Sequence, residues 1–204
     1  MTDTLLHALK INHLSASPRQ ITQFSRYLAL LKTWNNVFNL TTLTTQHDMV
    51  YLHLIDSLLA APHLQGTRLL DVGSGCGMPG IPLAIWNPGL SFVLIDKNSK
   101  KTRFLTQVVA ELGLTHVMVI HDRSENFHPD QGFDSIISRA FGTLRLFVET
   151  TQHLLQPTGV LLAMKGKYPQ DELIDLPEGY KAQVTPLNIK GISVERHMVC
   201  LTRT

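Results

Sequence analysis

The stretch LLDVGSGCGMPGIPLAIWNPGLSFVLID, residues 69–96, decides the fold of this chain. Two apolar runs flank a glycine-rich loop and a segment long enough for a short helix. Gly75, Gly77 and Gly80 fit the pattern G-x-G-x-x-G, and Asp96 follows at about the 20-residue spacing of nucleotide-binding α/β folds. The stretch therefore predicts a strand, loop, helix and strand unit that binds a ligand containing a nucleoside.

The rest of the C-terminal two thirds repeats this alternation of strands and helices. Such alternation predicts a parallel sheet with helices on both faces. The expected strands are RLLDV (68–72), SFVLID (91–96), HVMVIH (116–121), FDSIISR (133–139) and GVLLAMK (159–165). The expected helices cover residues 81–87, 100–112 and 143–155. Ser99 is the expected cap of the second of these helices, and Gly113 its stop.

The end of the chain differs from this pattern. YKAQVTPLNI (180–189) and SVERHMVCLTR (193–203) read as two strands joined by a short turn at Lys190–Gly191, with no helix between them. Strands joined in this way pair antiparallel. The sequence thus predicts an α/β, Rossmann-like fold with a seven-stranded, mostly parallel sheet whose last strand is antiparallel.

The N-terminal third reads as helical. In residues 17–36, apolar side chains recur at three- and four-residue steps, and Ser17 before Pro18 is a typical helix start. Residues 44–64 predict a second helix, in which Thr45 and Asp48 have the spacing of a capping box. We therefore expect an N-terminal helical segment, residues 1–66, packed on an α/β domain of residues 67–204.

Asp71, just before the glycine loop, distinguishes between the possible ligands. A dinucleotide places its pyrophosphate against this loop, and a carboxylate about 5 Å from one phosphate charge costs about 3 kcal/mol at an effective dielectric of 20. S-adenosylmethionine has no phosphate, and its sulfonium and ammonium groups are stabilised by a carboxylate. The alternative is that Asp71 only accepts hydrogen bonds from loop amides. Asp71 and the antiparallel end of the sheet favour S-adenosylmethionine.

Composition limits the cellular compartment and the kinds of partner that the sequence predicts. The chain has 204 residues and two cysteines, which offer no disulfide framework or metal-binding pattern. Its start has no signal-peptide pattern and no apolar run is as long as a membrane span. The net charge of +2 permits a polyanionic partner without demanding one. We expect a cytoplasmic protein that binds neither membrane nor metal.

Seven stretches, spread over nearly the whole chain, occur in the same order as in one known family. They are WNNVFNLTTL (34–43), HLIDSL (53–58), DVGSGCGMPGIPLAI (71–85), DKNSKKTRFL (96–105), FDSIISRAF (133–141), MKGK (164–167) and ERHMV (195–199). Together they resemble the bacterial 16S rRNA methyltransferase G family, also called glucose-inhibited division protein B. The resemblance implies a class I S-adenosylmethionine-dependent methyltransferase. It would methylate N7 of one guanine in a loop near the decoding centre, on 16S rRNA, the small ribosomal subunit or its assembly intermediate.

The resemblance also implies where the cofactor binds. The contacts that it implies are Gly73, Met78, Ser124, Glu125 and Arg139, and the general pattern of the class adds Asp71, Gly75, Gly77 and Asp96. Ser124 or Glu125 would lie beside the adenine. Arg139 would bind the cofactor carboxylate or guanine O6, and we expect the cofactor role. As an arginine at a strand end in an open cleft, Arg139 should contribute little to the core.

Four residues are candidates for contact with RNA: Arg123, Phe141, Lys165 and Lys167. Phe141 would stack on a base, and the lysines would hold phosphates. Core packing for Phe141 and a solvated turn for the lysines are equally compatible with the sequence. Basic side chains at 97–103 read as an exposed helix face.

The sequence offers no obvious general base or nucleophile. Guanine N7 has a free lone pair and no proton to lose, so positioning alone would supply most of the rate. Cys76 and Cys200 lie away from the fourth strand and read as packing residues. His53 and Asp56, three residues apart on one helical face, read as packing or capping groups against the α/β domain.

Two other functions stay open at this point. A small-molecule methyltransferase of the same fold would use the helical segment as a lid, and salt-dependent binding of rRNA would distinguish it. A non-catalytic interaction module on a degenerate methyltransferase fold would fail to bind S-adenosylmethionine in calorimetry.

Overall fold

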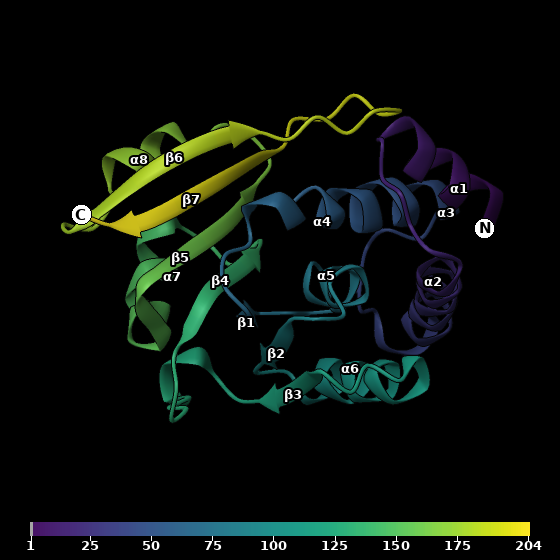
Figure 1. The fold of residues 1–204 in the computed structure, drawn as a ribbon, viewed down its shortest axis with the longest axis horizontal. Coiled ribbons are helices and arrows are strands. Elements are labelled where there is room, and N and C mark those ends of the chain that lie inside the picture. Colours follow the sequence, from purple (N-terminus) through teal and green to yellow (C-terminus); the bar gives the residue numbers. More distant parts are fainter. Residues whose placement is uncertain (1) are drawn as a thin grey trace.

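The computed structural model describes residues 2–204 and is built around one seven-stranded sheet in the order β3-β2-β1-β4-β5-β7-β6 (Figure 1). The strands are β1 (Arg68–Val72), β2 (Ser91–Asp96), β3 (Val117–His121), β4 (Phe133–Arg139), β5 (Leu155–Lys165), β6 (Tyr180–Pro186) and β7 (His197–Arg203). Strand β7 runs antiparallel to both of its neighbours, and all other pairs are parallel. The predicted fold class, including the antiparallel last strand, is confirmed.

Helices cover both faces of this sheet. The helical elements are α1 (Thr2–Ile11), α2 (Pro18–Phe38), α3 (Gln46–Asp48), η1 (Met49–Ile55), α4 (Asp56–Leu58), η2 (Ala61–His63), α5 (Gly80–Trp86), α6 (Ser99–Leu112), η3 (Ser124–Asn126), α7 (Leu144–Thr151), η4 (Gln152–Leu154) and α8 (Gln170–Ile174). Alternate strand residues enter two separate apolar clusters. The cluster containing Leu69 and Leu94 includes side chains from α1, α2, α5 and α6, and the cluster containing Leu70 and Ile95 includes side chains from α7.

The N-terminal helices share their core with the sheet. Phe24, Tyr27 and Leu31 of α2 are fully buried in the same cluster as Phe104 of α6. The start of α2 has the expected cap, because the Ser17 hydroxyl accepts a hydrogen bond from a backbone amide one turn on. These helices therefore add a wall to the α/β domain along the side that carries α5 and α6 (Figure 1).

Three local expectations are wrong. The cap of α6 is Asn98, whose side chain accepts from the amide of Lys100, and Ser99 is already helical. The second N-terminal helix is not regular, since η1 is a π-helix between α3 and α4. The residues that follow α7 form the 3₁₀ turn η4, and β5 begins at Leu155, earlier than expected.

The connection between β6 and β7 is longer than the expected turn at Lys190–Gly191. Residues 187–196 leave the sheet and reach the N-terminal helices, as the yellow segment near α1 shows in Figure 1. The amide of Lys190 donates to Asn12 Oδ1 at 2.8 Å, and Asn12 Nδ2 donates back to the Lys190 carbonyl at 3.1 Å. Contacts with a segment almost 180 residues away hold this loop, which no local turn signal could show.

Candidate cofactor and acceptor site

The site lies where the sheet changes direction. Strands β1 and β4 are neighbours, and the chain continues outward from them on opposite sides. Ligands of open α/β sheets bind at the carboxyl ends of strands at such a point. The loops after β1, β2, β3 and β4 meet there and border two adjoining cavities. Gly73, Lys101 and Ala140 line both cavities.

The first cavity, of about 520 Å³, is built by the ends of the parallel strands. Of the predicted site residues it is lined by Gly73, Asp96, Arg123, Ser124, Glu125 and Phe141. Asp96 holds the glycine loop, since its Oδ2 accepts from the Gly75 amide at 2.9 Å and its Oδ1 from the Asn98 amide at 2.8 Å. Each carboxylate oxygen keeps a second lone pair, so both remain able to accept from ribose hydroxyls.

The second cavity, of about 750 Å³, lies between the glycine loop and the N-terminal helices. Of the predicted cofactor residues it is lined by Gly73, Gly75, Met78 and Arg139. Its opposite wall is the end of α2 and the segment that follows, with Asn35, Asn39, Leu40, Thr41, Thr42, Thr44 and His53. None of these wall residues was predicted from the sequence to contact a ligand.

The glycines of the G-x-G-x-x-G pattern have different roles. A Cβ on Gly75 would meet no atom closer than 3.7 Å and would project into the second cavity. A Cβ on Gly77 would come within 2.6 Å of Ile81, and one on Gly80 within 2.3 Å of Leu94. Gly75 thus leaves room for a side chain or a ligand, whereas Gly77 allows close packing of the loop on the helices and Gly80 allows close packing on the sheet. Gly77 lies outside the lining of both cavities.

Asp71 lies behind the glycine loop and lines neither cavity. It is fully buried, and its Oδ2 accepts from the Gly80 amide at 2.9 Å, while its Oδ1 has no partner among the described residues. Burial raises the pKa of Asp71 from 3.8 to about 7. The contact with a loop amide is the alternative that the sequence analysis left open for this residue.

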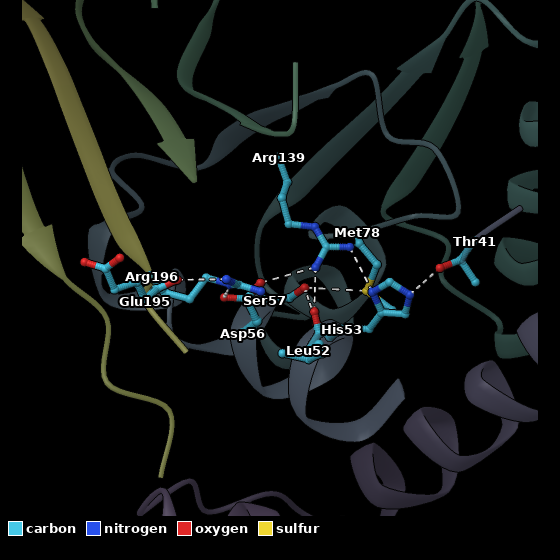
Figure 2. A network of polar contacts seen from close by, with 9 residues as sticks. All are labelled: Thr41, Leu52, His53, Asp56, Ser57, Met78, Arg139, Glu195 and Arg196. Carbon is cyan, nitrogen blue, oxygen red and sulfur yellow. Dashed lines mark hydrogen bonds and ion pairs between the residues drawn. The ribbon is translucent and has the colours of Figure 1, made fainter. Parts of the chain in front are cut away.

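Arg139 lines the second cavity, but most of its side chain is buried, so the expectation that it contributes little to the core is wrong. Its side chain is only 20% exposed and turns toward the π-helix η1 (Figure 2). Nη1 donates to the Leu52 carbonyl at 2.8 Å and pairs with Asp56 Oδ2 at 3.3 Å. Nη2 contacts His53 Nδ1 at 2.9 Å. Arg139 therefore joins the end of β4 to the N-terminal helical segment.

The contact with Arg139 fixes the tautomer of His53. A guanidinium only donates, so Nδ1 of His53 is the acceptor and Nε2 carries the proton. That Nε2 lies 2.8 Å from the Thr41 hydroxyl, to which it donates (Figure 2). Burial first, and then the charge of Arg139, lower the pKa of His53 to about 3. His53 is neutral at physiological pH, with both ring nitrogens in hydrogen bonds.

Asp56 is the buried anion of this network. Its carboxylate is 1% exposed and lies between two arginines, Arg139 and Arg196, with Arg196 Nε at 3.4 Å from Oδ1 (Figure 2). His53 and Asp56 thus pack against the α/β domain, as expected. The partners Arg196, Leu52 and Thr41 were not predicted from the sequence. The only sequence signal for such partners is an acid three residues after a histidine on a predicted helix.

The candidate RNA residues lie in different surroundings. Lys165 Nζ donates to Glu172 at 2.8 Å and also contacts the Gly142 carbonyl, whereas Lys167 is exposed. Arg123 is exposed at the rim of the first cavity. Phe141 packs edge-on against Phe147, with ring centroids 5.7 Å apart, while it also lines the first cavity.

Three further predictions concern the thiols, metal binding and membrane-spanning helices. Cys76 is 7% exposed in the core, and burial raises the pKa of its thiol, as expected for a packing residue. Within residues 2–204, no cluster of three or more His, Cys, Asp or Glu side chains is arranged to hold a metal ion. None of the helices described is long and apolar enough to cross a membrane.

The seven-stranded sheet with its antiparallel β7, the glycine loop and the acid at the end of β2 define a class I S-adenosylmethionine-dependent methyltransferase. Solved structures of methyltransferases share this fold. The glycopeptide N-methyltransferase MtfA with bound S-adenosyl-homocysteine is 11% identical and matches 74% of this chain and 90% of its own, with a TM-score of 0.63. An rRNA methylase from Streptococcus thermophilus is 17% identical and matches 73% of this chain and 94% of its own, with a TM-score of 0.52.

Sequence comparison identifies the family. The model of the family described as rRNA small subunit methyltransferase G matches residues 20–199. The protein of that name from Chromobacterium violaceum is 52% identical over 88% of this chain and 87% of its own length. The protein of the same name from Vibrio atlanticus is 40% identical over 100% of this chain and 98% of its own length. The chain belongs to the rRNA small subunit methyltransferase G family, and its cofactor is S-adenosylmethionine.

Proposed function

We propose that this protein transfers the methyl group of S-adenosylmethionine to N7 of a guanine in 16S rRNA of the small ribosomal subunit, the position 527 that the family resemblance implies. The names of its relatives support the class of substrate, small-subunit rRNA. The choice of N7 rests on one observation at the second cavity. The histidine and the thiol that line this cavity, and the Asp56 carboxylate near His53, are engaged or buried.

The state of each such group supports this choice. His53 uses Nδ1 to accept from Arg139 and Nε2 to donate to Thr41. Asp56 is buried between Arg139 and Arg196. The Cys76 thiol has a raised pKa and little exposure, so it is a poor nucleophile. An acceptor atom with a free lone pair needs none of these groups.

The residues present fit S-adenosylmethionine. The first cavity would take the adenosine, with Asp96 accepting from the ribose hydroxyls and Ser124 and Glu125 beside the adenine. Gly73 lines both cavities, so the methionine part would pass over it, and the space left by Gly75 would receive that part. Arg139 and Met78 line the second cavity, within reach of the same part.

The proposed chemistry is a direct displacement. When bound, the cofactor supplies a methyl group on a positively charged sulfur. The N7 lone pair forms the new bond to carbon as the bond from carbon to sulfur breaks, and the positive charge moves to the guanine ring. The protein's task is to hold the base in line with the methyl group and to exclude water, which supplies most of the rate. We place no general base in this scheme.

Methylation of purified particles tests the proposal. The protein, labelled S-adenosylmethionine and small subunits from cells that lack the enzyme are incubated, and the labelled nucleotide is mapped. We expect one labelled guanine, methylated at N7. A parallel reaction with naked 16S rRNA shows which form is the substrate. Label on a different base or atom would contradict the N7 assignment, and absence of any label in rRNA would contradict the substrate class.

A further inference from the structure

The wall of the second cavity has polar side chains that the fold itself does not use. Asn39, Thr42 and Thr44 line this cavity and are exposed. Among the hydrogen bonds of residues 2–204, none involves the side chains of these three residues. Their donors and acceptors are therefore available to a ligand.

The backbone beneath these side chains is firmly held. Asn35 Oδ1 accepts from the Thr41 amide at 2.8 Å, and the Thr41 hydroxyl accepts from the Leu43 amide at 3.1 Å. The same hydroxyl meets His53, which contacts Arg139 in turn (Figure 2). Leu40 is buried. Hydrogen bonds thus hold the wall and tie it to the end of β4.

Asn39 has the most informative position in this wall. It ends α2 in the left-handed conformation, with φ of 50° and ψ of 54°, and its amide donates to the Asn35 carbonyl. Glycine is the residue best suited to this conformation at a helix end, and asparagine is the next choice. Glycine would serve the backbone at least as well, so the carboxamide at this position is free to serve a ligand.

In the proposed reaction the second cavity holds two groups, the methionine part of the cofactor and the acceptor base. The cofactor part would lie on the side of Gly73 and Gly75, and Asn39 is on the wall of the N-terminal segment. When N7 of guanine faces the methyl group, the base still offers O6 as an acceptor and N1–H and N2–H₂ as donors. A carboxamide has both a donor and an acceptor to meet such an edge. Proteins read unpaired RNA bases through these edges.

We propose that the wall of residues 39–44 binds the target nucleobase and that the Asn39 carboxamide hydrogen-bonds its polar edge. This inference rests on the proposed function and adds the residue that selects the base. It makes the N-terminal helical segment part of the substrate site. A splayed-out guanine enters between this wall and the glycine loop, and the rigid link through Thr41, His53 and Arg139 sets its distance from the methyl group.

Substitution of Asn39 by glycine tests the proposal, because glycine keeps the left-handed helix end and removes only the carboxamide. The matched control is His13→Gly, at another left-handed residue, with φ of 56°, that lines neither cavity. Melting temperature, S-adenosylmethionine affinity by calorimetry, and kcat/KM on unmethylated small subunits are measured for both variants and the wild type.

We expect Asn39→Gly to keep the melting temperature and cofactor affinity of the wild type and to lose 10- to 100-fold in kcat/KM, or about 1.4–2.8 kcal/mol. His13→Gly should keep all its activity. Unchanged kcat/KM for Asn39→Gly would overturn the inference while the proposed function stands. A matching loss of cofactor affinity would also overturn it, because Asn39 would then serve the cofactor. Wild-type protein that binds cofactor but labels no rRNA would instead refute the proposed function on which the inference rests.

Discussion

The two cavities are built from different parts of the chain. The first is bordered by the ends of parallel strands and the loops and helices that follow them, within residues 72–150. The second takes half of its wall from the N-terminal segment, residues 35–53. The α/β unit alone therefore builds the cavity that we propose for the nucleoside. The cavity that we propose for the acceptor is complete only when the helical segment is packed on that unit, so this segment is where we expect specificity for a substrate to arise.

The largest effect on stability should come from breaking the buried network that joins the N-terminal helical segment to the α/β unit. Asp56→Asn keeps the size of the buried side chain but removes the negative charge between Arg139 and Arg196. Loss of one partner of a buried ion pair costs about 3–5 kcal/mol. We expect a decrease of that order in the free energy of unfolding, measured by urea denaturation.

The control for this prediction is an ion pair at the surface. Asp175 pairs with Arg145 at 2.8 Å, and its side chain is 61% exposed. Asp175→Asn should change stability little, because water replaces the pair. Equal losses for Asp56→Asn and Asp175→Asn would show that the buried network does not hold the N-terminal segment in place.

The next effect is on how stability depends on pH, through two buried groups near the cavities, Asp71 and His53. Asp71 lies behind the glycine loop with a pKa of about 7 in place of 3.8, because it is buried. His53, in the wall of the second cavity, has a pKa of about 3 in place of 6.5, because of burial and Arg139. The native state thus keeps a proton on Asp71 that the unfolded state releases, and lacks one on His53 that the unfolded state binds.

These two groups give opposite dependences of stability on pH. The stability due to Asp71 is complete below about pH 4 and is lost as pH rises through 7. The stability due to His53 is complete above pH 6.5 and is lost as pH falls through 3. Between these limits the slopes cancel. Asp71→Asn should make stability rise with pH by about 1.4 kcal/mol per unit relative to the wild type, and His53→Gln should make it fall.

Urea unfolding of both variants at several pH values between about 4.5 and 6.5 measures these slopes. Glutamine at position 53 keeps an acceptor for Arg139, so the native contacts are preserved as far as possible. Parallel pH profiles for Asp71→Asn and His53→Gln would mean that neither group titrates as its burial implies.

The sequence was sufficient for the fold class, and for the loop and acid that we propose hold the cofactor, because these signals are local. The glycine loop, the acid at Asp96 and the alternation of strands and helices depend on neighbouring residues, and the fold class follows from them. The acceptor side depends on contacts such as Arg139 with His53, which are 86 residues apart. A pattern of residue types cannot show such a contact, and it also could not show that Arg139 is half-buried instead of free.

The glycine pattern illustrates the same limit within a single motif. Gly75, Gly77 and Gly80 are equivalent in the sequence, yet only Gly75 has room for a Cβ without a close contact. The other two permit contacts with Ile81 of α5 and Leu94 of β2, which depend on how the loop folds onto the helices and the sheet. The motif therefore predicted a loop at the edge of the cavities, but not which of its glycines leaves room for a side chain.

Gly75→Ala sharpens this distinction. Gly75 has φ of +60°, so alanine is strained there by about 1–2 kcal/mol. The added Cβ also enters the space proposed for the methionine part of the cofactor. We expect at least a tenfold loss of S-adenosylmethionine affinity in calorimetry, about 1.4 kcal/mol, with NAD binding undetectable in the wild type and the variant alike.

The strain itself is controlled by Gly113→Ala. Gly113 ends α6 with φ of +62°, and nothing lies near its Cβ position. The two variants should lose similar stability, and Gly113→Ala should keep its cofactor affinity. If both bind S-adenosylmethionine equally well, Gly75 does not face the cofactor.

The smallest effect concerns Lys165, the last residue of β5, and Lys167 just after it, which line neither of the two cavities. Lys165 is held by Glu172 and is 16% exposed, whereas Lys167 is exposed. A lysine that contacts a phosphate releases counterions on binding, so its removal lowers the slope of log affinity against log salt by about 1. We expect this for Lys167→Ala in filter binding of 16S rRNA. Lys165→Ala should leave the slope unchanged and reduce thermal stability, because its charge is already neutralised within the fold. An equal decrease in slope for both variants would mean that RNA displaces Glu172 from Lys165, and the phosphate path would then extend along β5 toward the cavities.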